Sequence, residues 1–284
     1  MFLTNTKIAK RALNQTLASN TCVVKIRDEY SAMLLSDLHF GSGNDADDAN
    51  DISILNCLQY CLEKNIQTII LNGDIFEGWE SDIDDIIDHC LHDSIRQEII
   101  KILQRYADSS ALYYNKGNHE PEQLKKLLEA LGLSDVKVTN SILLKFYCNQ
   151  TQLRSKMFVI HGHQADGLNY CYPALPKFFV KWLWTPIQKL TGLKWGWPTP
   201  AKSKLKQNKI DNIMMSWTAS NNLHTIIGHT HQPQLNDKYY NIGCGVYKNN
   251  EITSIELSYK DNITLKLISC SDKNKFNILK AKNI

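Results

Sequence analysis

Short apolar runs in the first half of the chain end repeatedly in polar clusters. Residues 33–35 run into Ser36-Asp37-Leu38-His39, and residues 68–71 run into Asn72-Gly73-Asp74. Each pattern predicts a buried strand that opens into a loop. The apolar run at 112–114 predicts a third strand of the same kind.

Helical spacing separates these predicted strands. Residues 52–62 and 83–106 carry apolar side chains three and four positions apart, which is typical of amphipathic helices. Pro121 predicts the start of another helix through residue 131, because a missing N–H has no cost in the first turn. A short helix is also expected in the N-terminal extension, residues 1–27. The alternation of strands and helices predicts a parallel sheet.

The second half of the chain consists mainly of predicted strands. Apolar runs place them at 142–148, 157–160, 225–227, 239–242, 252–259 and 263–268. We therefore expect an α/β fold and a single domain over residues 1–284. Open α/β folds place their chemistry just beyond the carboxyl ends of strands, and five polar clusters follow such ends in this chain.

The composition is that of a folded globular protein. Hydrophobic residues make up 43% and charged residues 21% of the 284 positions, and the net charge is only +3, which is too balanced for a nucleic-acid coat protein. The eight cysteines contain no CxxC pair, so we expect a reduced, cytoplasmic protein, with contact with the inner face of a membrane as an extension of that expectation. No apolar run approaches the ~20 residues of a membrane span.

The polar clusters after the strands are rich in groups that bind metals. They contain Asp37, His39, Asp74, Asn118, His119, His161, His163, His229 and His231. On an extended segment, residues two apart point to the same side, which applies to Asp37 with His39 and to His229 with His231. Carboxylate, amide and imidazole ligands suit manganese, iron, zinc or nickel, and their number exceeds what one ion needs. The sequence therefore predicts two divalent ions that share a carboxylate.

The order of these motifs resembles the calcineurin-like metallophosphoesterase superfamily. The resemblance rests on Asp37-Leu38-His39, Gly73-Asp74-Ile75-Phe76-Glu77, Gly117-Asn118-His119-Glu120, His161-Gly162-His163 and Gly228-His229-Thr230-His231. It implies a sandwich of two mixed β-sheets flanked by helices, with a two-metal site at the ends of the sheets.

The resemblance also implies a role for each motif residue. One ion would be held by Asp37, His39, Asp74 and His231, and the other by Asn118, His161 and His229, with Asp74 as the bridge. Manganese is the first expectation for the metal. His119 would stabilise the phosphate charge or protonate the leaving oxygen, since imidazole titrates near neutral pH. Two alternatives remain for Glu77, His163 and Asp166. They either form hydrogen bonds with residues of the site or are exposed polar residues without a functional role.

An aromatic and basic insertion is predicted to be helical and to overhang the site. Residues 167–210 contain eight Lys, eight aromatic residues and no Asp or Glu, and they lie between the His161 and His229 motifs. This composition is typical of an interfacial element attracted to anionic headgroups. The sequence leaves three hypotheses for the role of this insertion. It could be a lid over an amphiphilic phosphate with peripheral membrane contact, a packed interface, or a surface that binds single-stranded nucleic acid.

The function expected from these features is two-metal hydrolysis of a phosphoester or pyrophosphate by attack of metal-bound hydroxide. The substrate would be a small-molecule, lipid-linked or nucleotide-linked phosphate. The Gly-Asp-Ile-Phe-Glu motif, Trp79 and the insertion look most like the UDP-2,3-diacylglucosamine hydrolases, although those enzymes usually have Arg where this chain has His119. The alternatives are a nuclease or nucleotide phosphodiesterase, and a binding scaffold without turnover.

Overall fold

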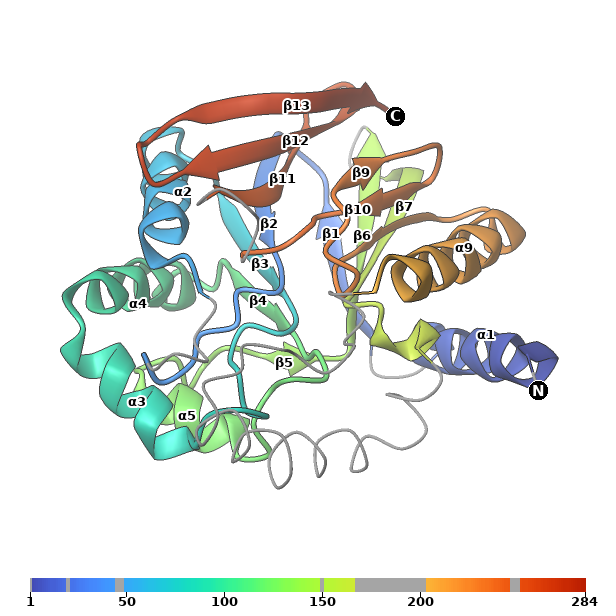
Figure 1. Ribbon diagram of the computed structural model, residues 1–284. Coiled ribbons are helices and arrows are strands. Elements are labelled where there is room, and N and C mark those ends of the chain that lie inside the picture. The colour runs from blue at the N-terminus through green and yellow to red at the C-terminus, as the bar shows by residue number, and fades with distance from the viewer. Residues whose placement is uncertain (1, 19–20, 44–48, 149–150, 167–202, 246–250) are drawn as a thin grey trace.

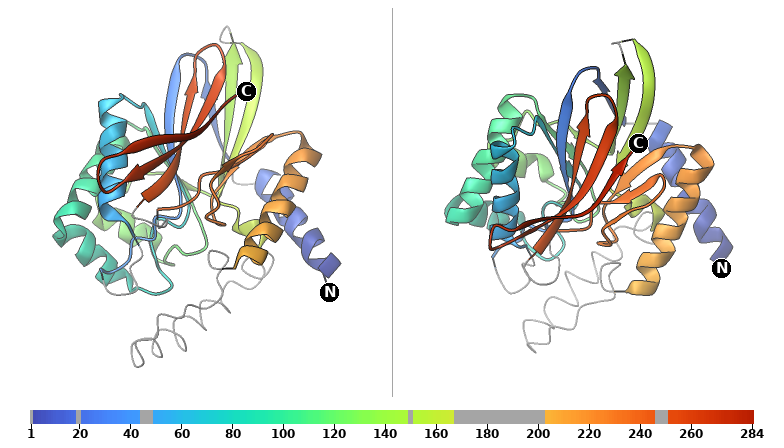
Figure 2. Two further views of the ribbon diagram at one scale, coloured as in Figure 1. Left: turned by 45° about the horizontal axis from the view of Figure 1, so that its top comes forward. Right: turned by 90° about the horizontal axis from the view of Figure 1, so that it is seen from above.

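Two β-sheets lie face to face, and helices cover both outer faces (Figures 1 and 2). The computed structural model describes residues 2–18, 21–43, 49–148, 151–166, 203–245 and 251–284. The helices are α1 (Phe2–Ala18), α2 (Asp51–Glu63), α3 (Ile83–His92), α4 (Ser94–Asp108), α5 (Leu124–Ala130), the short 3-10 helix η1 (His163–Ala165) and α9 (Lys204–Asn221). Within the described ranges, no helix combines the length and the apolar character that crossing a bilayer requires.

The first sheet has seven strands in the order β13-β12-β11-β2-β3-β4-β5. Its strands β2 to β5 run parallel, and β11, β12 and β13 join antiparallel to them and to one another. The members are β2 (Tyr30–Leu35), β3 (Thr68–Asn72), β4 (Leu112–Asn115), β5 (Val138–Thr139), β11 (Glu251–Tyr259), β12 (Ile263–Ser271) and β13 (Phe276–Asn283).

The second sheet has six strands in the order β1-β6-β7-β8-β10-β9. Strands β7, β8 and β10 are parallel, whereas β6 runs antiparallel to β7. The members are β1 (Thr21–Ile26), β6 (Ser141–Cys148), β7 (Gln152–Ile160), β8 (His224–Ile227), β9 (Gln234–Leu235) and β10 (Tyr239–Asn241). The expected fold class, two mixed sheets flanked by helices, is confirmed.

Three apolar clusters hold these layers together. Because alternate side chains of a strand point to opposite faces, Ala32 and Leu34 of β2 enter the cluster between the sheets, while Met33 and Leu35 face α2, α4 and α5. The third cluster covers the outer face of the six-stranded sheet with α1 and α9, and Trp217 is its largest member. The extension at residues 1–27 thus supplies a helix and an edge strand to the sandwich.

Two of the sequence predictions about helices were wrong in detail. The helix expected over residues 83–106 is two helices, because the Asp93 backbone is extended and its carboxylate accepts the N–H groups of Ile95 and Arg96 to begin α4. Pro121 does not begin α5. The Leu124 N–H donates to the Pro121 carbonyl in a separate turn, and the helix starts at Leu124.

The insertion expected at residues 167–210 is described only at its end. Residues 167–202 lie outside the described ranges, and residues 204–210 form the first turns of α9. Ile210 of this segment is buried against the six-stranded sheet, whereas Leu205 is exposed. The sequence pattern did not predict α9, nor the strands β1, β5, β9 and β13.

Candidate active site

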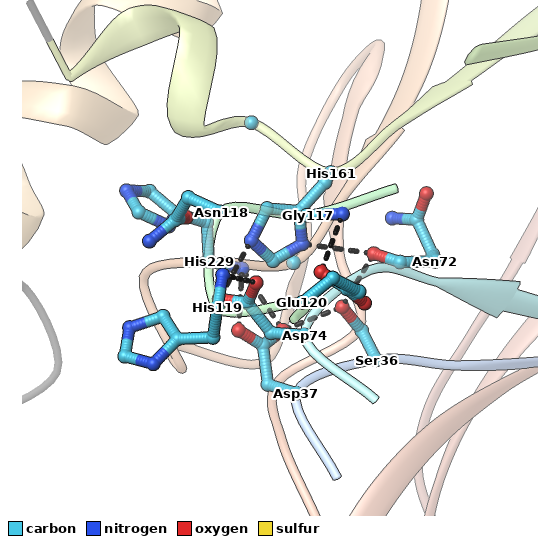
Figure 3. Close-up of polar contacts among 12 residues, drawn as sticks. Ser36, Asp37, Asn72, Asp74, Gly117, Asn118, His119, Glu120, His161 and His229 are labelled. Carbon is cyan, nitrogen blue, oxygen red and sulfur yellow. Dashed lines mark hydrogen bonds and ion pairs between the residues drawn. The ribbon is translucent and has the colours of Figure 1, made fainter. Parts of the chain in front are cut away.

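The polar clusters meet at one end of the sandwich. Strands β2, β3 and β4 of one sheet lead into Asp37, Asp74 and Asn118, and strands β7 and β8 of the other sheet lead into His161 and His229. Figure 3 shows these side chains converging. The five strand-end loops that the sequence separates by up to 192 residues therefore form one site, as a backbone hydrogen bond from the His229 N–H to the Asp37 carboxylate, 2.9 Å long, illustrates.

A first group of candidate metal-binding atoms comes from Asp37, His39 and His231. One atom from each of these side chains lies within 4.8 Å of the others. The closest pair is His231 Nε2 and Asp37 Oδ1, 3.1 Å apart. Asp37 is fully buried, and Ser36 donates its hydroxyl to the same carboxylate at 2.5 Å. The carboxylate therefore has a fixed orientation toward the imidazole.

A second group comes from Asp74, His161 and His229, again within 4.8 Å. His161 Nε2 lies 3.0 Å from Asp74 Oδ2. The other ring nitrogen of His161, Nδ1, donates to the Asn72 carbonyl at 2.9 Å, which leaves Nε2 as the nitrogen that faces the site. The second Asp74 oxygen accepts the His119 backbone N–H at 2.8 Å.

A third group joins His39 and His119 through Glu77. The Glu77 carboxylate lies 2.8 Å from His39 Nδ1 and 2.7 Å from His119 Nδ1. One buried acid therefore sets the tautomer of both rings and presents Nε2 of each to the site. From the sequence, a hydrogen-bonding role of Glu77 in the site was no better supported than a surface role. In the structure, its carboxylate lies inside the site.

Several buried side-chain atoms of the site have no hydrogen-bond partner among the described residues. They are His39 Nε2, His229 Nε2 and both polar atoms of the Asn118 side chain, and all are buried. Buried polar atoms are almost always paired, because leaving one unpaired costs ~1–3 kcal/mol. Imidazole nitrogens and an amide oxygen next to two carboxylates form a donor set that suits divalent ions, so the residues present fit the two metals that the sequence predicts.

The charges of the site shift the pKa values of its members. Burial would raise the pKa of Asp74, but His161 and His119 outweigh it and hold that pKa well below its ordinary value. Burial would lower the pKa of His119 and of His161, whereas the neighbouring carboxylates raise each to about 9. His229 is different, because burial dominates and lowers its pKa. The carboxylates of the site are therefore charged at neutral pH.

The backbone at the ligands is left-handed rather than extended. Asp37, His39, Asp74, His229 and His231 have φ angles between 51° and 63°. The expectation that each Asp-x-His or His-x-His pair aligns its side chains through an extended segment was therefore wrong. Non-glycine residues seldom adopt this conformation, and such strain concentrates at functional sites where the surrounding structure enforces it.

Two motif glycines are required by close packing around the carboxylates. A Cβ at Gly117 would overlap the Asp74 carboxylate, and a Cβ at Gly228 would overlap Ser36 and Asp37. Glu120, which follows His119, does not face the ligands. It accepts the N–H groups of Ile75 and Gly117 and the Tyr114 hydroxyl, and burial together with Asp74 raises its pKa to about 7.

Other predicted residues lie behind the ligands. The His163 ring is 5.5 Å from that of His161 between centroids. Asp166 Oδ2 lies 3.8 Å from His229 Nε2 and 3.1 Å from Lys206 Nζ of α9. Lys206 was not predicted as a neighbour of the site, because its only signal in the sequence is membership of a lysine-rich segment. Ser36 was not predicted either, although its position directly before Asp37 was visible.

Comparison with known proteins identifies the family. The calcineurin-like phosphoesterase family matches residues 31–265. GAP50, the anchor in the inner membrane complex of Plasmodium, has a similar fold, with a TM-score of 0.52, 13% identity, and coverage of 90% of this chain and 89% of that one. No curated protein matches the chain in sequence.

Two further solved structures are similar at lower scores. Yfce, a phosphoesterase from E. coli, is 14% identical over 89% of this chain and 99% of its own, with a TM-score of 0.45. A dimetal phosphatase from Danio rerio is 11% identical over 90% of this chain and 98% of its own, with a TM-score of 0.46.

The family match spans most of the chain and contains all five loops of the site. The buried ligand atoms left without a partner agree with it, because they are the ones that metal ions would complete. The resemblance to the UDP-2,3-diacylglucosamine hydrolases is not confirmed by any of these matches. The chain belongs to the calcineurin-like phosphoesterase family and is a metal-dependent phosphoester hydrolase.

Proposed function

We propose that the chain cleaves a phosphoester or pyrophosphate bond at a centre of two divalent ions, with manganese as the first choice. One ion is assigned to Asp37, His39, Asp74 and His231, and the other to Asp74, Asn118, His161 and His229. The observation that carries this assignment is the set of buried, unpartnered atoms of His39, Asn118 and His229 around the two aspartates. When bound, the ions supply Lewis acidity toward the phosphoryl oxygens and lower the pKa of water.

The protein's own groups orient this centre. Asp37 and Asp74 each accept a backbone N–H from another loop, at 2.9 Å and 2.8 Å, so each carboxylate has one oxygen fixed by the fold. Glu77 and the Asn72 carbonyl fix the tautomers of His39 and His161. These hydrogen bonds present oxygen and Nε2 atoms in one direction, toward the phosphoryl group of a substrate.

We assign proton donation to His119. Its Nδ1 is held by Glu77, and its Nε2 is therefore the nitrogen available to the leaving oxygen. The nearby carboxylates raise the pKa of His119 to about 9 against the effect of burial, which favours the proton-carrying form of the ring. A positioned general acid of this kind contributes roughly 10²- to 10⁴-fold to the rate.

The assignment is tested with purified protein, 4-nitrophenyl phosphate and bis(4-nitrophenyl) phosphate, with and without Mn²⁺. Asp74→Asn should lower the rate roughly a thousandfold and reduce the metal content measured by elemental analysis. Asp88→Asn is the matched control, because the Asp88 side chain is 76% exposed on α3. Absence of hydrolysis with Mn²⁺, Fe²⁺, Zn²⁺ and Ni²⁺ would contradict the proposal.

For the substrate class, we propose an amphiphilic phosphate of the kind that UDP-2,3-diacylglucosamine represents. The support is compositional: residues 167–210 combine eight Lys with eight aromatic residues and no acid. The described end of that segment brings Lys206 to Asp166, whose carboxylate is 3.8 Å from His229. A cation carried by the end of the insertion therefore lies near the site.

This substrate class predicts binding to anionic vesicles. The wild-type protein should co-sediment with vesicles of phosphatidylglycerol and phosphatidylcholine. Replacement of Trp182 and Trp184 by Ser should abolish this co-sedimentation. Trp217→Phe is the control, because Trp217 is buried in the core. Degradation of single-stranded oligonucleotides, with binding that weakens steeply as salt rises, would instead favour the nuclease.

A further inference from the structure

The His119 imidazole is packed on more than one side by aromatic rings. The indole of Trp79 is stacked on it, with centroids 4.1 Å apart and an angle of 17° between the ring planes. The His39 ring meets it edge-on at 4.9 Å and 85°. Trp79 is 5% exposed, so the stacked pair is largely removed from solvent. Together with Glu77 at Nδ1, these rings limit the orientation of the imidazole.

Trp79 is itself fixed to the loop that carries His119. Its indole N–H donates to the Asn118 carbonyl at 2.7 Å, and its backbone N–H donates to Glu77 Oε1 at 3.0 Å. Between them, the Gly78 N–H donates to the His119 carbonyl at 2.8 Å. The segment 77–79 therefore lies alongside residues 118–119, and the indole cannot move independently of the general acid.

The stacked indole adds a second constraint to the hydrogen bond with Glu77. The Glu77 carboxylate accepts from His119 through Nδ1 alone, and a combined change of χ1 and χ2 can keep that hydrogen bond while Nε2 moves. A stacked indole removes this freedom, because rotation of the imidazole would break the face-to-face contact. Proton delivery depends on such alignment, and a displacement of about 1 Å in a catalytic group costs up to ~100-fold in rate.

We propose that Trp79 is a positioning residue, whose stacked indole holds the His119 imidazole in the plane from which Nε2 reaches the leaving oxygen. This role rests on the proposed function, because it concerns the same general acid. It differs from metal binding: the indole contacts the His119 ring and the main-chain carbonyl of Asn118, whereas the atom of Asn118 assigned to an ion is the side-chain oxygen.

The test uses two esters that differ in their need for a proton. Phenyl phosphate has a basic leaving group and depends on the general acid, whereas 2,4-dinitrophenyl phosphate has a leaving group that departs unprotonated. Trp79→Leu should lower kcat for phenyl phosphate ~10- to 100-fold and kcat for the dinitrophenyl ester at most ~3-fold, with KM unchanged for both. Trp79→Phe keeps an aromatic face and should restore most of the lost rate.

Two controls separate positioning from loss of structure. Trp217→Leu removes another buried indole, one that packs in the α1 and α9 layer and is not stacked on His119, and should change the rates of the two esters by the same factor. In a His119→Ala background, Trp79→Leu should cause no further loss on phenyl phosphate, because the ring that it positions is gone.

The possible failures are distinguishable. Equal losses on both esters in Trp79→Leu, or a full additional loss in the His119→Ala background, would overturn the positioning role while wild-type activity leaves the proposed function standing. A wild-type protein that hydrolyses neither ester with any divalent metal would overturn both. A lower metal content in Trp79→Leu than in Trp79→Phe would also count against the role, since it would assign the indole to metal binding.

Discussion

Replacement of Arg96 by Met should destabilise the protein through one buried cation. Arg96 lies on α4 with 2% of its surface exposed. Its Nε donates to Asp51 Oδ2 at 2.8 Å, its Nη1 donates to the Gly41 carbonyl at 2.5 Å, and its guanidinium lies 5.0 Å from the Phe40 ring centroid. Methionine fills much of the same volume but donates no hydrogen bond, so Asp51 and Gly41 lose this partner.

The expected cost follows from the exposure of the two ionic side chains. Removing one partner of a fully buried ion pair costs about 3–5 kcal/mol in the free energy of unfolding. The Asp51 side chain is 20% exposed, so water compensates part of its charge, and we expect a value near the lower limit, about 3 kcal/mol. For a chain of this size, that loss corresponds to a decrease in Tm of roughly 6–9 °C.

Urea unfolding monitored by circular dichroism measures this loss. Asp51→Asn and the double variant complete a cycle, and the pair should show a coupling free energy of about 1–3 kcal/mol. Lys101→Met on the same helix is the control, because Lys101 and its partner Glu98 are both more than half exposed, and it should cost less than about 0.5 kcal/mol. The reasoning is refuted if Arg96→Met costs less than about 1 kcal/mol or if the two single variants are additive.

Three further outcomes are expected. Mn²⁺ at 100 times its Kd should raise Tm over that of EDTA-treated protein, since each ion adds ~2.7 kcal/mol of binding free energy; calorimetry showing no shift would contradict the metal assignment. Gly117→Ala should lose metal and activity together, because its Cβ would displace Asp74; unchanged metal content in elemental analysis would be the contrary result. Asp211→Ala should cost about 2–4 kcal/mol in urea unfolding, since it removes the acceptor to which the Thr230 and Tyr239 hydroxyls both donate, whereas Asp211→Asn keeps an acceptor and should cost less than half of that.

The strands that carry the site were predictable because their surroundings are simple. Strands β2, β3 and β4 are buried on both faces, so each reads as an unbroken apolar run that ends where the polar loop begins. The parallel arrangement then brings Asp37, Asp74 and Asn118 to one edge. The sequence therefore predicted which residues converge, together with the class of metal that they suit.

The elements that the sequence did not reveal depend on tertiary contacts. Strand β13 is an exposed edge strand with Ile278 and Leu279 largely accessible, so no burial pattern marks it. Residues 204–210 of α9 were assigned to the basic insertion and residues 211–221 to no element, although one face of this helix buries Ile210 and Trp217. The break between α3 and α4 depends on the Asp93 carboxylate, which accepts backbone N–H groups at the start of α4. The sequence does not reveal this interaction, because an aspartate at this position is equally compatible with an exposed site inside one continuous helix.

The orientation of the candidate ligands was the least predictable feature of the site, because it depends on contacts between loops. Five left-handed residues are tolerated because hydrogen bonds between loops hold them: the Asp37 N–H donates to the Gly73 carbonyl and the His39 N–H to the Asp74 carbonyl. These bonds join residues far apart in sequence, so only the assembled sandwich can supply them. Folding therefore gathers the carboxylates and imidazoles at a cost that the three apolar clusters offset.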